Sequence, residues 1–212
     1  MQLVEMRWQG PLQGPDLLKA LNYDGESILD QWGVYVAIQK FPRITVAYAG
    51  EAKGLKIKNT IKDRWWSHID QFRKLNFNLH VVDPKKPVRE GRGGFSEDAA
   101  DPTYEYRAIE KKSLTASRKF FLRHVAEKEI EKIELYFCRF PDPEGDGAAD
   151  IALLPNTDIK AAISEVEGQL IRALYELEAG HDHFACDNSK SGRAQRSFRI
   201  DLEAFKSWIL TL

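Results

Sequence analysis

The stretch GVYVAIQKFPRITVAYAGEAKGL, residues 33–55, decides how this chain is expected to fold. It holds two apolar runs, VYVAI and ITVAYAG, which are rich in β-branched and aromatic residues and are separated by a turn that contains proline. The gap between them is short, and this favours an antiparallel hairpin. Each run also carries one tyrosine beside a glycine, in GVY (33–35) and in YAG (48–50). Because a buried phenol needs a hydrogen-bond partner, the two tyrosines raise the question of what their hydroxyls meet.

The segments that follow the hairpin predict a helix and a third strand. Residues 60–75 (TIKDRWWSHIDQFRKL) have apolar side chains at helical spacing, with Thr60 as a cap and Asp63 three residues later. Residues 132–140 (KIELYFCRF) form a short apolar run that is typical of a strand. Strands and helices do not alternate as they do in parallel sheets. We therefore expect an α+β fold, with a small three-stranded antiparallel sheet flanked by helices.

We expect one domain with additions at both ends. The length of 212 residues suits a single domain, or one domain with a large insertion. Residues 33–190 would form this domain, and residues 76–130 would be an insertion, because their Pro, Gly and charged residues make too long a stretch for an ordinary connection. Residues 1–32 are expected to be a helical lead-in, and residues 191–212 a C-terminal extension.

Composition predicts a cytoplasmic protein that does not enter a membrane. The chain is 43% apolar and 30% charged, and no run approaches the ~20 apolar residues that a membrane span needs. The N-terminal residues MQLVEMRWQG lack the continuous apolar stretch of a signal peptide. The two cysteines, Cys138 and Cys186, do not make a disulfide framework, which suits a reducing compartment.

Charge is distributed unevenly, although the formal net charge is only −1. Residues 52–92 hold eleven Lys and Arg against four Asp and Glu, whereas residues 127–167 hold four against eleven. Such a chain can present a basic face to a polyanion, although solvated loops and helix faces would give the same pattern. The candidate DNA contacts in the basic stretches are Lys53, Lys56, Lys58, Lys85, Lys86, Arg89 and Arg92.

Two predicted helices carry polar residues on their apolar faces. At about 100° per residue, Glu167 lies between Ile163 and Ile171 on the apolar arc of the helix over residues 157–180, which is expected to end at Gly180. A carboxylate on such a face is costly unless something binds it. In the earlier helix, Arg64 and His68 lie one turn apart, at the edge of the apolar arc and within it. Singly, each has a structural explanation, such as a hydrogen-bonded core histidine or a Glu–Arg pair.

Taken together, these residue types complement one another, because arginine stabilises phosphate, glutamate holds a divalent metal, and tyrosine or histidine handles a proton. In the order and type of these residues, the chain resembles the GIY-YIG nuclease family. GVY and YAG stand for the two strand motifs of that family, although Ala49 replaces the usual isoleucine. DRWWSH supplies the arginine and the histidine four residues on. The number of residues between Tyr48 and this arginine is larger than in compact members of the family. EGQLI, with Glu167, and CDNSKSGR, with Asn188, supply the later glutamate and asparagine.

The resemblance implies metal-dependent hydrolysis of a DNA phosphodiester bond. Glu167 would ligate Mg²⁺ or Mn²⁺, which suit an oxygen-rich, water-rich shell with a single carboxylate. Arg64 would stabilise the charge that grows on the phosphorane-like transition state, and Tyr35 would help to deprotonate the attacking water. His68 and Tyr48 would orient or assist that water. The implied catalytic set is Tyr35, Tyr48, Arg64, His68, Glu167 and Asn188.

Several functions remain open from the sequence. The leading expectation is a sequence-specific endonuclease of the restriction type, for which a palindromic site would imply a homodimer on DNA, since one active site cuts one strand. The alternatives are a repair or mobile-element nuclease, a catalytically inactive module that binds nucleic acid, and an unrelated α+β domain. A separate hypothesis places Zn²⁺ on His181, His183 and Cys186, which lack the further ligand that a structural zinc site needs.

Overall fold

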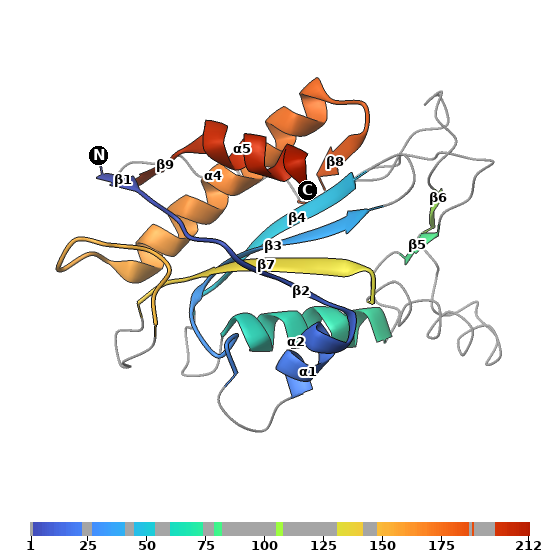
Figure 1. Cartoon of the computed structure of the whole chain (residues 1–212), viewed down its shortest axis with the longest axis horizontal. Helices are drawn as coiled ribbons and strands as arrows, with labels where there is room; N and C mark the ends of the chain where they lie inside the picture. The colour runs from blue at the N-terminus through green and yellow to red at the C-terminus, as the bar shows by residue number, and fades with distance from the viewer. Residues whose placement is uncertain are drawn as a thin grey trace.

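The computed structural model describes residues 2–22, 27–40, 45–53, 60–73, 79–81, 105–107, 131–141, 148–186, 188 and 198–212. Its centre is a mixed sheet of five strands in the order β2-β7-β3-β4-β8 (Figure 1). The strands are β2 (Gln9–Gln13), β3 (Gly33–Lys40), β4 (Thr45–Ala52), β7 (Ile133–Arg139) and β8 (Phe184–Cys186). The predicted α+β class is confirmed, but this sheet has five strands rather than the expected three.

The three strands predicted from the sequence form the middle of the sheet. β3 and β4 pair antiparallel from Lys40 opposite Thr45 to Gly33 opposite Ala52, and β7 pairs antiparallel with the other side of β3. The two strands that were not predicted lie at the edges, with β2 antiparallel to β7 and β8 parallel to β4. β2 contains Pro11, which cannot donate to a ladder and therefore suits an edge. β8 has only three residues, which is too short to give a periodic signal.

Helices cover both faces of the sheet. Figure 1 shows α4 (Ile159–Gly180) and α5 (Leu202–Thr211) on one face, and α1 (Gly14–Asn22) and α2 (Ile61–Arg73) on the other. Along β3, Val34, Val36 and Ile38 pack in the core beneath α4, whereas Tyr35 and Ala37 pack with α1 and α2. This alternation is the period of two expected of a strand, and it directs the Tyr35 side chain to the α2 face.

The remaining described strands form two small sheets. β1 (Gln2–Val4) runs parallel to β9 (Phe198–Ile200), so segments from both predicted extensions lie side by side. β5 (Leu79–Val81) and β6 (Glu105–Arg107) pair antiparallel inside the predicted insertion, the rest of which lies outside the described residues. The predicted lead-in contributes the edge strand β2 as well as helix α1. None of the described helices combines the length and the apolar character that a membrane span requires.

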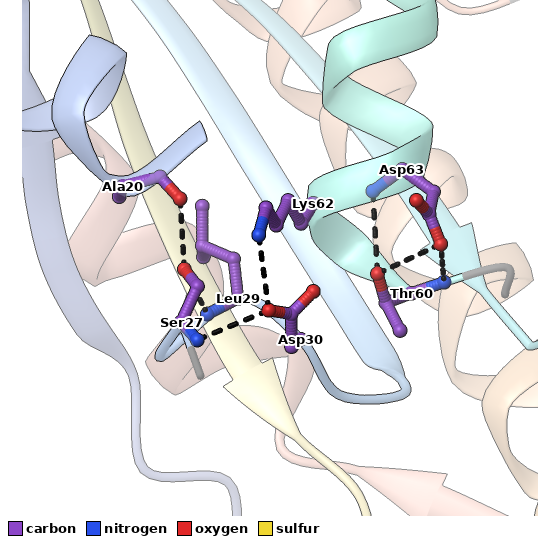
Figure 2. Close-up of polar contacts among 7 residues, drawn as sticks. All are labelled: Ala20, Ser27, Leu29, Asp30, Thr60, Lys62 and Asp63. Atoms are coloured by element: carbon purple, nitrogen blue, oxygen red, sulfur yellow. Dashed lines mark hydrogen bonds and ion pairs between the residues drawn. The ribbon is translucent and has the colours of Figure 1, made fainter. Parts of the chain in front are cut away.

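Helix α2 begins with the reciprocal cap that the sequence predicts (Figure 2). The Thr60 backbone N–H and the Thr60 hydroxyl both donate to Asp63 Oδ2 at 3.1 Å, and the Asp63 backbone N–H donates to Thr60 Oγ1 at 3.2 Å. These bonds satisfy N–H groups that the first turn of a helix leaves without a partner inside the helix. Because Arg64 belongs to this first turn, the cap also fixes where its side chain starts.

The loop that precedes β3 holds the same end of α2 against the sheet. The Ile61 backbone N–H donates to the Gln31 carbonyl at 3.0 Å. Asp30 Oδ2 accepts from the Ser27 backbone N–H at 3.0 Å and pairs with Lys62 Nζ at 3.1 Å (Figure 2). The start of α2 is therefore bound to residues that lead directly into the first tyrosine strand.

Candidate active site

The side chain of Tyr35 lies across Gly50, its register partner on β4. A Cβ atom at Gly50 would be 2.5 Å from Tyr35 Cζ and 2.8 Å from Cε2, closer than real Cβ atoms approach. At Gly33, a Cβ atom would overlap the Cys138 carbonyl oxygen and lie 3.1 Å from Ile61 Cδ1. The glycines of both strand motifs are therefore required by close approach, at Gly33 of the backbone of β7 and at Gly50 of a phenol ring.

Arg64 of α2 brings a positive charge to both strand tyrosines. Its guanidinium makes side-chain hydrogen bonds with Tyr35 and with Tyr48. The two tyrosine rings are 6.2 Å apart between centroids. Partial burial lowers the pKa of Arg64, but the two phenols outweigh it and raise this pKa, so Arg64 remains charged. Tyr35 is fully buried, Tyr48 is half-buried and Arg64 is exposed as a whole residue, so the site is reached from solvent on the arginine side.

Tyr35 is a neutral phenol at ordinary pH. Burial raises its pKa well above the usual 10.0, and nearby Tyr48 raises it further. Arg64 lowers this pKa through its charge and its hydrogen bond, but does not offset the burial, and the charge of Glu167 raises it again. The ring also packs against Trp65, with centroids 5.6 Å apart. The protein therefore holds the Tyr35 hydroxyl in its protonated form, able to donate a hydrogen bond.

Glu167 reaches this site from α4, the helix on the other face of the sheet. It is half-buried, and it lies near enough for its charge to act on Tyr35. β8 pairs with β4 only from Thr45 to Ala47, so no described strand pairs with this side of β4 beyond Ala47. The groups that gather here are a guanidinium, two phenols and a carboxylate. All the donors that a metal ion would meet among them are oxygens, and this fits a hard cation such as Mg²⁺ or Mn²⁺.

Asn188 lies beside β4 and contacts its backbone. Its side-chain nitrogen donates to the Ala49 carbonyl at 2.6 Å, and its side-chain oxygen accepts from the Ala49 N–H at 2.9 Å. The Asn188 side-chain oxygen also accepts from the Cys186 thiol at 3.7 Å, and the Asn188 carbonyl accepts from the Tyr175 hydroxyl. The buried amide thus continues along β4 the pairing that β8 begins. In this position Asn188 holds the strand between Tyr48 and Gly50.

Other predicted site residues lie partly or wholly outside the described structure. His68 belongs to α2, one turn after Arg64, but its side chain is not among those described. Lys53 is described, and its ammonium pairs with Glu51 at 2.8 Å. The other predicted DNA contacts lie outside the described residues, namely Lys56, Lys58, Lys85, Lys86, Arg89 and Arg92.

The zinc hypothesis gains no support from the geometry. His181 and His183 are exposed between the end of α4 and the start of β8, whereas Cys186 is buried in the core on β8. Within the described parts of the chain, no three His, Cys, Asp or Glu side chains are grouped to hold a metal ion. The spacing in the sequence placed these residues near one another, but the strand directs the thiol toward Asn188.

Sequence reasoning missed two polar residues beside the site, Glu51 and Ser164. Their side chains form a hydrogen bond of 2.9 Å between β4 and α4. Strand alternation contained a signal for Glu51, because a residue that follows Gly50 must face the opposite side of the sheet from Tyr35. Nothing in the sequence indicated which residue of α4 it would meet.

No protein-family model, no curated protein and no solved structure matched this chain. The resemblance to GIY-YIG nucleases therefore depends on the residues themselves and on their placement. Four of the six residues that the resemblance selects, Tyr35, Tyr48, Arg64 and Glu167, come together from β3, β4, α2 and α4. This arrangement can bind an anion at Arg64 and present phenol hydroxyls to it, with the charge of Glu167 in range of Tyr35.

Proposed function

We propose that this chain is a metal-dependent endonuclease that hydrolyses phosphodiester bonds in DNA. The observation that carries the proposal is the contact of the Arg64 guanidinium with the phenols of two adjacent strands, within range of the Glu167 charge. A structural Glu–Arg pair would have no need of the two phenols. A phosphodiester, by contrast, calls for a cation on its oxygens, hydroxyls that orient water, and an acidic group for a divalent ion.

The hydrogen bonds of Arg64 suggest how the phenols act. A guanidinium can only donate, so Tyr35 and Tyr48 accept from it with their oxygen atoms. Each hydroxyl keeps its proton while its oxygen accepts, so in the complex with DNA it can turn this proton toward a phosphate oxygen or a water molecule. Arg64 has further N–H groups in its planar fork, and these can bind the phosphate and neutralise the charge that grows on it. In this role the phenols orient the water and the phosphate, and Tyr35 is not a tyrosinate base in the free protein.

Glu167 would hold the Mg²⁺ or Mn²⁺ ion. When bound, such an ion polarises a phosphate oxygen and steadies the leaving 3′ oxygen. The protein's own contribution is the half-buried position of this carboxylate. Neutralising the charge of Glu167 would also remove one cause of the raised pKa of Tyr35, so the phenol would release its proton more readily.

The finer proposal is a restriction-type enzyme that cuts at a specific site. The basic residues of the predicted insertion support it, because phosphate contacts position a protein on DNA and side chains from such loops can reach the bases. Cutting both strands would then need a homodimer on DNA. A repair or mobile-element nuclease would share the active site and differ in its substrate.

A cleavage assay tests the proposal. Mixed plasmid and genomic DNA would be incubated with Mg²⁺ or Mn²⁺ and with wild type, Glu167→Ala or Glu176→Gln. Glu176 is an exposed residue of the same helix that pairs with Lys206, so its variant is the matched control. We expect discrete fragments with wild type and the control and none with Glu167→Ala. Nicking or smearing that depends on Glu167 would keep the nuclease and favour repair. Salt-sensitive binding without cleavage by any variant would instead indicate a binding module.

A further inference from the structure

Glu51, the residue after Gly50, joins the second tyrosine strand to helix α4. Its register partner on β3 is Val34, which packs in the core beneath α4. Glu51 Oε2 accepts a hydrogen bond from the Ser164 hydroxyl at 2.9 Å. Glu51 Oε1 pairs with the Lys53 ammonium at 2.8 Å. One carboxylate therefore has a partner in α4 and another just beyond the end of β4.

The contact at Ser164 bears on the position of Glu167. The two residues are three apart in α4 and so lie on the same side of the helix, about one turn from each other. The α4 side chains buried toward the sheet, such as Val166, are mostly apolar. Apolar contacts have little directionality, so they limit the depth of a helix more than its rotation. A hydrogen bond is directional. Tyr175 and Gln169 anchor the later part of α4 in this way. The bond between Glu51 and Ser164 is the one that lies one turn from Glu167, so it helps to set where Glu167 lies relative to Tyr35.

Lys53 gives the Glu51 carboxylate a single orientation. The side chains of Lys53 and Glu51 are only 25% and 23% exposed, so solvent screens this pair less than a surface pair. With Oε1 held by the ammonium, Oε2 is left to face Ser164. The path from strand to helix thus runs from Lys53 through Glu51 to Ser164, one turn from the carboxylate of Glu167.

We propose that Glu51 is a positioning residue of the active site, which fixes Glu167 by holding α4 through Ser164. This inference rests on the proposed nuclease function and deepens it. Glu51 acts without touching the reacting phosphate, because both of its oxygens are engaged within the protein. Loss of the contact is therefore expected to change the chemical step and the affinity for the metal ion, and to leave DNA binding largely as it is.

Four variants test the coupling. Ser164→Ala and Glu51→Ala should each lower kcat about three- to tenfold, the worth of one lost hydrogen bond. KM for DNA should stay nearly unchanged in Ser164→Ala, which leaves the pair between Glu51 and Lys53 intact. The double variant should fall no further than either single one, because both remove the same contact. Glu51→Gln keeps an oxygen that accepts from Ser164 and should restore most of the lost rate. Glu176→Gln, on the same helix, is the control.

Two measurements do not depend on cleavage. Binding of Mn²⁺ alone, followed by electron paramagnetic resonance, should weaken severalfold in Ser164→Ala and remain near the wild-type value in Glu51→Gln. Hydrogen exchange of the backbone amides in the first half of α4 should be faster in Ser164→Ala than in wild type, and close to the wild-type rate in Glu51→Gln. If wild type cleaves no DNA, the proposed function fails, and these two measurements still decide on Glu51. Additive losses of kcat in the double variant would overturn the inference. So would a Ser164→Ala protein whose kcat, Mn²⁺ affinity and hydrogen exchange all equal those of wild type.

Discussion

The phenol ring of Tyr35 occupies the space that a side chain at Gly50 would need. The two residues are register partners on β3 and β4, and a Cβ atom at Gly50 would approach Tyr35 Cζ to 2.5 Å. The glycine of the second strand motif and the tyrosine of the first are therefore one structural unit. Because Tyr35 also meets Arg64, a change at position 50 is expected to reach the active site without touching it directly.

Replacing Gly50 by alanine should displace Tyr35 and lower both stability and activity. Overpacking of a closely fitted site costs roughly 1–3 kcal/mol, and the displaced hydroxyl should lower kcat by at least about tenfold. Urea unfolding and steady-state cleavage measure the two effects. Gly180→Ala is the matched control, because a Cβ atom there meets nothing within 4 Å. A Gly50→Ala protein with wild-type kcat would show that the position of Tyr35 is not critical.

Replacing Arg64 by lysine should abolish most of the activity while the fold stays intact. An ammonium lacks the planar fork that reaches two phenols and a phosphate together. Loss of one preorganised donor in an active site typically costs about 100-fold or more in kcat. The control is Arg172→Lys, at an exposed position of α4. Single-turnover cleavage rates, with circular dichroism as the test of folding, would decide. A decrease of less than threefold would remove Arg64 from the mechanism.

The raised pKa of Tyr35 predicts how stability depends on alkaline pH. The pKa is raised chiefly by burial, so the folded protein keeps the Tyr35 proton after the unfolded chain has begun to lose it near 10.0. The folded state then binds more protons, and the free energy of unfolding falls as pH rises above 10, by up to about 1.4 kcal/mol per pH unit for this group. The contribution of protonated Tyr35 to the free energy of unfolding is fully present below pH 10.

Tyr35→Phe removes this group and should flatten the stability curve above pH 10. Urea unfolding of both proteins between about pH 8 and 11 measures the difference in slope. Tyr136, whose pKa is raised to about 12 by burial and by Glu134, adds a slope of its own and is kept in both proteins. Parallel curves for wild type and Tyr35→Phe would mean that the Tyr35 hydroxyl titrates as it does in water.

Asn188→Ala should loosen β4 at the active site. The substitution leaves the N–H and carbonyl groups of Ala49 without the amide that now binds both. Each buried group left without a partner costs about 1–3 kcal/mol, and kcat should fall because Tyr48 and Gly50 flank Ala49. Asp182→Ala, at an exposed turn position just before β8, is the control. Wild-type stability with lost activity would instead return Asn188 to a direct catalytic role.

The central strands and the two long helices could be predicted because their signals are local. Short apolar runs rich in β-branched and aromatic residues predict β3, β4 and β7, and the cap at Thr60 marks where α2 begins. The edge strands could not be predicted in this way. β2 contains Pro11 and β8 has three residues, so their pairing depends on the strands already in the sheet.

The types of residue at the candidate site were readable from the sequence, but their contacts were not. Helical spacing placed Glu167 on an apolar face and Arg64 at the edge of one. It could not tell that their helices lie on opposite faces of one sheet, since that depends on how distant segments pack. The bond between Glu51 and Ser164 and the pairing of Asn188 with Ala49 span more than one hundred residues of chain. No local pattern contains such contacts.

The pairing of Asn188 with Ala49 has a consequence for the behaviour of the chain in solution. A strand edge with exposed N–H and carbonyl groups can pair with an edge from another molecule and begin aggregation. β8 closes the edge of β4 only as far as Ala47, and a longer strand there would lie beside the tyrosine strand at the site. The side-chain amide of Asn188 bonds both backbone groups of Ala49, the next residue whose N–H and carbonyl point to that edge. Among the described residues, the Asn188 side chain thus covers the edge of β4 beyond β8 and hinders its pairing with a strand of a neighbouring molecule.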